Sequence, residues 1–158
     1  MTFEKYSEKI STIDLPFKVN CDNNLIGSDF GFSDSIRNKY AGIAFARIYG
    51  KLPYNEKYTG IIYLFAQDID LPILKITDKK GKEISSLALV MEPCGTYGPD
   101  GFTFSWCEIT SDLKIKQKDS SSTYNRDTLG NIIESSIKSK VTFTTYEIDN
   151  NGYLKMVQ

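Results

Sequence analysis

The 158-residue chain contains no histidine. Without an imidazole it has no histidine general acid or base, no Ser-His-Asp or Cys-His pair, and no histidine metal ligand. Phosphate-binding glycine motifs are also missing, because neither GxxxxGK[ST] nor GxGxxG occurs. We therefore expect a protein that is not an enzyme and that uses no cofactor or metal ion.

The chain also has no surplus of basic charge: 19 Lys and Arg residues stand against 20 Asp and Glu residues, for a net charge of −1. Nucleic-acid-binding proteins usually carry a basic surplus, so we expect no nucleic-acid partner. No apolar run approaches the roughly 20 residues of a membrane-spanning helix, so we expect no transmembrane segment. The composition, 41% hydrophobic and 25% charged, is typical of one globular domain over residues 1–158.

The first 42 residues combine helical patterns with turn-forming residues. Apolar residues at helical spacing predict a short helix over residues 3–11, with Thr2 as its cap. A second helix is expected over residues 34–40, with Ser33 as its cap. This part of the chain is predicted to be a helical and turn-rich N-terminal segment.

From residue 43 to residue 158 the pattern is that of short strands rich in Ile, Val, Tyr and Phe. No long helical pattern separates them, which argues against a parallel α/β sheet. We expect a mainly β protein with antiparallel strands in a meander, whether a sandwich, a barrel or propeller-like blades, behind one or two short N-terminal helices. The expected strands are 43–49, 58–66, 73–77, 84–91, 102–109, 113–116, 141–148 and 153–157.

Three Asp-x-x-Gly stretches recur, at residues 78–81, 127–130 and 149–152. In each one we expect the Asp to accept backbone N–H bonds and to start a type I turn, and the Gly to take the left-handed conformation that ends it. The uneven spacing of the copies argues against a repeat protein.

The most unusual segment is the Gly- and Pro-rich stretch 92–101, which we expect to be a loop. Its candidate binding residues are Glu92, Cys94, Tyr97 and Asp100. Two states of the three cysteines are possible: a cross-hairpin disulfide between Cys94 and Cys107, or three free thiols. The second is favoured.

Aromatic and basic residues supply further candidates. Ten tyrosines are present, and Tyr54 and Tyr58 are expected at a recognition surface, although strands are themselves rich in Tyr. The expected partner of such a surface is another protein or a surface glycan. Lysines alternate over residues 114–118, which predicts a basic strand face; Lys138 and Lys140 extend that face if their strand lies alongside.

Three stretches carry a resemblance to known proteins: IDLPF at 13–17, ITDKKGKEI at 76–84 and YEIDNNG at 146–152. In this order of features the chain resembles a group of small, β-rich proteins of Bacteroidota-type bacteria that are often exported or lipid-anchored. The resemblance implies a periplasmic or cell-surface location if a leader has been removed, and the protein is otherwise expected in the cytoplasm. It implies no enzymatic activity and provides no catalytic residues.

Together these observations predict a non-enzymatic binding or interaction protein, exported in its native form. The alternative is an immunity-type protein that neutralises a bacterial toxin by direct binding.

Overall fold

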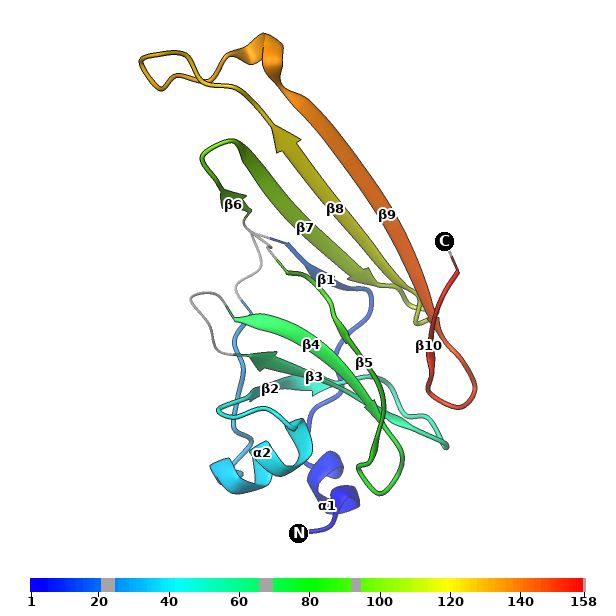
Figure 1. The fold of residues 1–158 in the computed structure, drawn as a ribbon. Coiled ribbons are helices and arrows are strands. Elements are labelled where there is room, and N and C mark those ends of the chain that lie inside the picture. The colour runs from blue at the N-terminus through cyan, green and yellow to red at the C-terminus, as the bar shows by residue number, and fades with distance from the viewer. Residues whose placement is uncertain (21–24, 66–69, 92–94, 158) are drawn as a thin grey trace.

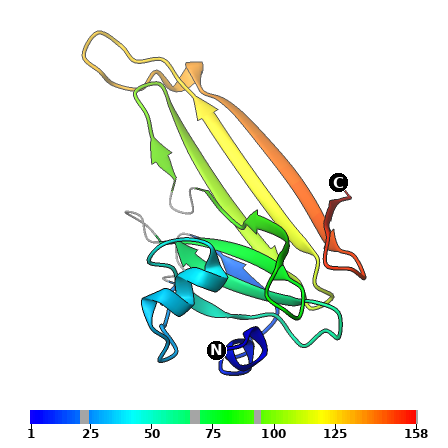
Figure 2. The ribbon, with the colours of Figure 1, turned by 60° about the horizontal axis from the view of Figure 1, so that its bottom comes forward.

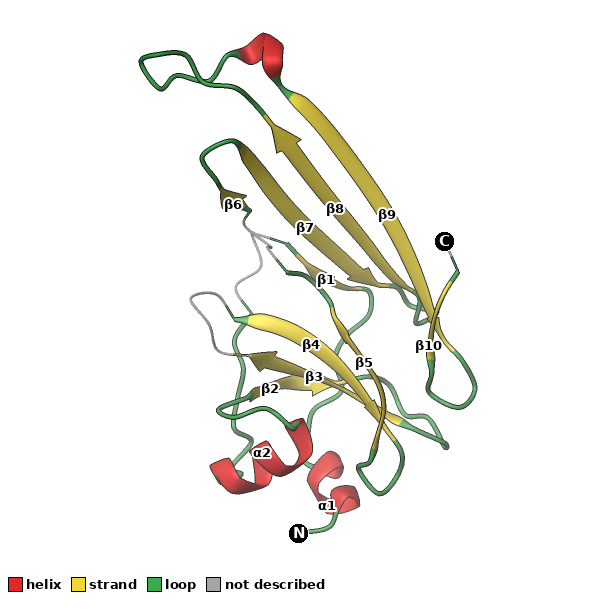
Figure 3. Cartoon of the chain, viewed as in Figure 1, coloured by secondary structure: helices red, strands yellow, loops and turns green. Residues whose placement is uncertain are grey.

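The computed structural model describes residues 1–20, 25–65, 70–91 and 95–157 (Figure 1). Within these ranges the protein consists mainly of antiparallel strands, with two short α-helices and one 3-10 turn (Figure 3). The predicted fold class is confirmed. Neither helix has the length and apolarity that a membrane-spanning segment would need, and the described residues contain no other α-helix.

The strands form two sheets. Sheet A has four strands in the order β2-β3-β4-β5, and sheet B has six, in the order β1-β7-β8-β9-β10 with β6 paired to β7. The strands of sheet A are β2 (Arg47–Lys51), β3 (Thr59–Phe65), β4 (Leu71–Thr77) and β5 (Glu83–Ala88). The strands of sheet B are β1 (Phe17–Val19), β6 (Thr96–Tyr97), β7 (Gly101–Ile109), β8 (Ile115–Thr123), β9 (Lys138–Ile148) and β10 (Leu154–Met156).

Each predicted strand has a counterpart, but the boundaries differ in places. Residues 43–46 are not a strand, because Gly42 and Phe45 have φ values of 70° and 58° and turn the chain there. β8 runs to Thr123, well beyond the predicted end, because its neighbours β7 and β9 hold a Ser- and Thr-rich stretch that has no apolar pattern of its own. The short strands β1 and β6 were not predicted at all.

The two helices, α1 (Phe3–Glu8) and α2 (Asp34–Ala41), cover one face of sheet A (Figure 2). Thr2 caps α1 as predicted, accepting a hydrogen bond from the Lys5 N–H at 3.4 Å. Ser33 is the N-cap of α2 but makes no side-chain cap hydrogen bond. Beneath the helices, the buried hydroxyls of Tyr6 and Tyr63 lie 3.2 Å apart, so each phenol has a polar partner in this apolar layer.

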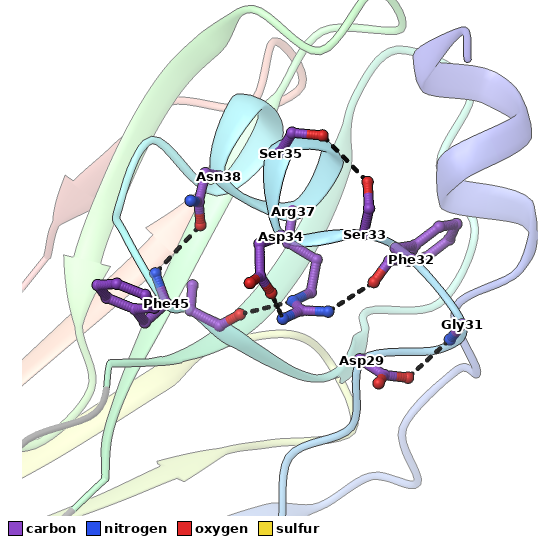
Figure 4. Close-up of polar contacts among 10 residues, drawn as sticks. Asp29, Gly31, Phe32, Ser33, Asp34, Ser35, Arg37, Asn38 and Phe45 are labelled. Carbon is purple, nitrogen blue, oxygen red and sulfur yellow. Dashed lines mark hydrogen bonds and ion pairs between the residues drawn. The ribbon is translucent and has the colours of Figure 1, made fainter.

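Arg37 fixes the segment that leads into and out of α2 (Figure 4). Its guanidinium donates to the carbonyls of Phe32, at 2.6 Å, and Ala46, at 3.2 Å, and pairs with Asp34. These groups lie on both sides of the helix, so one largely buried side chain joins three parts of the chain. We assign Arg37 this structural role.

The other face of sheet A packs against sheet B. The shared core includes Ile62 and Leu74 from sheet A and Cys107, Ile109 and Ile115 from sheet B. β3 is therefore buried on both faces, since its residues point alternately toward the helices and toward sheet B. Of the architectures that the strand pattern allowed, two packed open sheets correspond to the sandwich.

All three Asp-x-x-Gly turns form as predicted and are nearly identical. In each, the Gly N–H bonds to the Asp carbonyl at 3.0–3.1 Å, and the Gly φ is 86–89°. One Asp carboxylate oxygen accepts two backbone N–H bonds of 2.8–3.0 Å. In the third turn the Lys155 ammonium, followed by these backbone bonds, lowers the pKa of Asp149 to about 2.

Sheet B extends far beyond sheet A (Figures 1 and 2). We call this extension the arm: residues 101–106 of β7, 118–123 of β8 and 138–143 of β9, with β6 and the connecting segment 124–137. The remaining described residues form the body. The arm and the body share continuous strands, but the described arm residues are mostly exposed or half-buried, and only Ser105 and Tyr124 among them are buried.

Candidate interaction surface

In the body, the inner face of sheet B is apolar because it meets sheet A. Cys107, Ile109 and Ile115 point toward that core and are fully buried. Gln117 lies on the same face, and its side-chain N–H₂ donates to the carbonyls of Ala88 and Leu89 at 2.7 and 2.9 Å. The inner face is therefore identified by direct contacts with the opposite sheet.

In the arm, the apolar side chains lie on the opposite face. Alternation along β7 places residues 102, 104 and 106 away from the side of Cys107, and the register places residues 141 and 143 of β9 on the same face. Neither hydrophobic cluster of the described residues includes any of these side chains. We call them, with the residue opposite Phe102 in β6, the outer face: Tyr97, Phe102, Phe104, Trp106, Val141 and Phe143. The intervening strand β8 separates the two rows and presents Lys118, Ser120 and Ser122 on this face.

Two side-chain contacts on this face agree with the register. The rings of Tyr97 and Phe102 are 4.4 Å apart between centroids. Lys118, directly opposite Phe143 in the register, has its ammonium 5.9 Å from the centre of that ring. Tyr97, Val141 and Phe143 are open to solvent, with exposed fractions of 78%, 47% and 64%, whereas Phe102, Phe104 and Trp106 are half-buried.

The inner face of the arm is polar. Ser105 donates a hydrogen bond of 2.8 Å to Asp119, its direct neighbour across the sheet. Farther out, this face carries Thr142, Lys140 and Lys138. The apolar face of sheet B thus changes sides between body and arm, so the exposed apolar surface is not a continuation of the core.

The tip of the arm adds aliphatic residues to this exposed surface. The second Asp-x-x-Gly turn lies here, and its Leu129 is 86% exposed. The other large apolar residues exposed in the tip are Ile132, Ile133 and Ile137. A folded protein rarely leaves so many apolar side chains in water on one extension unless they contact another molecule.

The predicted lysine face needs correction. Lys116 and Lys118 share the outer side of β8, whereas Lys114 precedes the strand and pairs with Glu147 and Asp112. β9 does lie beside β8, as the prediction required. However, Lys138 and Lys140 stand opposite Thr123 and Ser121, which places them on the inner face. The register therefore separates the two lysine groups.

Tyr54 and Tyr58 lie on the body, where the β2–β3 connection and α1 border a groove of about 530 Å³. Tyr54 is exposed, and the Lys79 ammonium lies 4.8 Å from the centre of its ring. Lys79 also donates to the carbonyls of Tyr58, at 3.0 Å, and Asn55. Partial burial lowers the pKa of Lys79, an effect that Glu56 opposes. Through these contacts Lys79, in the turn between β4 and β5, holds the β2–β3 connection in place.

The four predicted site residues that the structure describes lie in two separate places. Tyr97 and Asp100 belong to the β6–β7 hairpin of sheet B, where the Asp100 carbonyl accepts a hydrogen bond of 3.0 Å from the Tyr124 N–H. Among the described residues, those around the groove of Tyr54 and Tyr58 include neither of them. Tyr58 is buried, which raises the pKa of its phenol. The predictions for Glu92 and Cys94 lie outside the described residues.

Cys107 is a free thiol, fully buried in the core between the sheets. Burial, with smaller effects of Glu108 and Asp119, raises its pKa to about 12. Its disulfide with Cys94 is therefore not supported, and the favoured prediction of a free thiol is confirmed for this cysteine.

The chain matches no family model, no curated protein and no solved structure at a significant level. The candidate surface therefore depends on geometry alone. Apart from Tyr97, the outer-face residues were not predicted, although the sequence carries a signal for them: aromatic residues at 102, 104 and 106 alternate with small polar ones. That pattern indicates a strand with one apolar face but not whether another layer covers it.

Proposed function

We propose that this is a non-enzymatic binding protein that recognises another protein through the outer face of the arm. The observation that carries the proposal is an aromatic sheet face that no other layer of the described chain covers. Tyr, Trp and Phe are enriched at protein interfaces, and Trp and Tyr are among the residues that most often supply the binding energy there. Their backbone here belongs to paired strands, so binding would cost little ordering of the chain.

A protein partner suits this surface better than a glycan. Val141 and the aliphatic residues of the tip extend the aromatic patch. Sugars stack on aromatic rings, whereas aliphatic side chains bury best against other apolar side chains. Lys118 lies between Trp106 and Phe143 in the register, with Lys116 next along the same face of β8, and the two favour a partner whose surface carries acidic residues.

Site-specific photo-crosslinking tests the proposal. A photoreactive residue at position 143, in cells that make the protein, is expected to yield one discrete protein adduct. The same residue at position 54 is the matched control, because Tyr54 is even more exposed but lies on the body. The captured protein is then purified, and its affinity for the Phe104→Ser/Phe143→Ser variant is measured. A loss of about thirtyfold or more is expected for two interface aromatics; equal crosslinking from both positions, or unchanged affinity, contradicts the proposal.

A further inference from the structure

The outer edge of β9 is open along the arm. β8 pairs with β9 on one side over residues 138–146, but on the other side β10 pairs only with residues 146–148. A last bond there joins the Val157 N–H to the Thr145 carbonyl at 2.9 Å. Within the described part of the chain, residues 138–144 of β9 therefore have no strand beside them on that edge.

The bond at Thr145 shows which residues direct their backbone groups to this edge. Alternate residues of an antiparallel strand present both their N–H and C=O groups on the same side. Ser139, Val141 and Phe143 therefore share the direction of Thr145, and their donors and acceptors on this edge have no backbone partner in the described part of the chain. Such an edge is a template for one more strand.

The two faces beside this edge differ in chemistry. Val141 and Phe143 are on the outer face, whereas Lys138 and Lys140 are on the inner face. Both lysines are exposed, and no ion pair of the described residues involves either of them. The nearest carboxylate in the register, Asp119, already accepts a hydrogen bond from Ser105.

We propose that the partner adds an extended segment to the edge of β9, with apolar side chains beside Val141 and Phe143 and acidic side chains beside Lys138 and Lys140. This inference rests on the proposed function and specifies the chemistry of the partner. Cross-strand neighbours lie on the same face, so a strand that alternates apolar and acidic residues satisfies both faces at once.

A second copy of the chain fits this edge less well. Antiparallel self-pairing centred on Val141 would use the three open residues of both strands. It would also place the Lys140 side chains of the two copies in diagonal positions on one face, where like charges repel. Charge therefore favours an acidic segment over self-association.

A peptide of alternating glutamate and valine, about seven residues long to match the open edge, is a direct probe. We expect it to bind the full chain at least about tenfold more tightly than a lysine–valine peptide of the same length, since charge is the main difference between them. A glutamate–valine peptide that is N-methylated on its pairing side should not bind. Hydrogen-exchange protection should increase at the amides of Ser139, Val141 and Phe143.

Ser139→Pro changes the protein side of the same contact. It removes an N–H that points to the open edge, a position where a sheet tolerates proline. Ser139→Ala is the matched control, because both variants lose the hydroxyl bond to Ser122 of 2.8 Å. The proline variant should weaken peptide binding by about tenfold, and the alanine variant should not.

Several results would overturn strand addition: no binding of the glutamate–valine peptide, equal binding of the lysine–valine or N-methylated peptide, or full binding by Ser139→Pro. A concentration-dependent dimer in sedimentation that Ser139→Pro abolishes would assign the edge to a second copy instead. If strand addition fails while position 143 still crosslinks a protein whose affinity depends on Phe104, the proposed function stands without it. If the peptide binds but position 143 gives no adduct, the proposed function fails.

Discussion

The body and the arm are built from the same strands but bury their side chains in opposite ways. In the body, residues 107 and 109 of β7 point inward to sheet A and are fully buried. In the arm, the inward side chains of the same strand are Thr103 and Ser105, and the aromatic ones point outward. The layer opposite a sheet, and not strand propensity, decides which face becomes a core.

This difference also separates stability from recognition. The body has two hydrophobic layers, one on each face of sheet A. The arm has ladders to β7 and β9 along β8 and cross-strand contacts such as that of Lys118 with Phe143, but no second layer among the described residues. Its order depends on strands that are anchored in the body, which leaves its outer face available to a partner.

The largest expected contrast is between a core truncation and an arm truncation. Ile62→Ala removes a fully buried side chain between the sheets and should lower the free energy of unfolding by about 2–5 kcal/mol. Val141→Ala, on the exposed outer face, should change it by less than about 0.5 kcal/mol. Urea unfolding of both variants measures this difference, and similar losses in the two would refute the separation of arm from body.

The tyrosine pair beneath α1 should give the next largest effect. Tyr6→Phe leaves the Tyr63 hydroxyl buried without its partner at 3.2 Å, at a cost of about 1–3 kcal/mol. Tyr153→Phe is the control, because that tyrosine is exposed. Urea unfolding should show no change for the control, and an unchanged Tyr6→Phe variant would mean that the hydroxyl pair contributes nothing.

The same pair predicts a loss of stability in alkali. Burial raises the pKa of Tyr6 to about 12, above its ordinary value of 10.0. The folded protein therefore holds the Tyr6 phenol proton more tightly than the unfolded chain does. The contribution of this proton to the free energy of unfolding is complete below pH 10 and is lost as the pH rises toward about 12. Unfolding measured across this range should show a smaller slope for Tyr6→Phe; an equal slope would contradict the assignment.

The smallest expected effects concern the Asp-x-x-Gly turn, which occurs in the body at Asp149 and at the tip of the arm at Asp127. The pKa of Asp149 is lowered from 3.8 to about 2, so its stabilisation is present above the higher value and is lost as the pH falls through the lower one. Asp149→Asn should remove this part of the acid dependence. The Asp149 turn is tied to sheet A through the Ser85 hydroxyl, which donates to the Gly152 carbonyl at 2.7 Å.

Asp127→Asn changes the same turn at the tip of the arm. It should alter hydrogen exchange near residue 127 but move the global acid transition less than Asp149→Asn, because the tip lies away from both cores. A larger global shift for Asp127→Asn would show that the tip unfolds together with the body.

Most of the fold was predictable from local signals. The strand positions followed from Ile-, Val- and Tyr-rich runs, and the Asp-x-x-Gly turns followed from side-chain bonding that needs only neighbouring residues. The second half of β8 was not predictable, because partner strands and not its own Ser and Thr residues keep it extended.

The candidate surface was less predictable than the fold. Of the tyrosines predicted at a binding surface, Tyr97 and Tyr54 are exposed, whereas Tyr58 is buried. Phe104 and Trp106 carry a clear alternation, but strands with this pattern usually pack their aromatic face into a core. Only the packing of the two sheets shows that sheet A lies on the other face of β7, so that among the described residues no second layer meets Phe104 and Trp106. The separation of Lys118 from Lys140 likewise depends on the register between β8 and β9. A shift of one residue would move Lys140 to the face of Lys118.

The most direct test measures partner affinity and unfolding free energy in the same Phe104→Ser/Phe143→Ser protein, with the partner captured from position 143. The account predicts a loss of affinity of about thirtyfold or more, with a change in unfolding free energy below about 1 kcal/mol. Retained affinity would contradict the assignment of this aromatic face to binding. A loss of several kcal/mol in stability would instead show that the arm's aromatic side chains form part of the folded core.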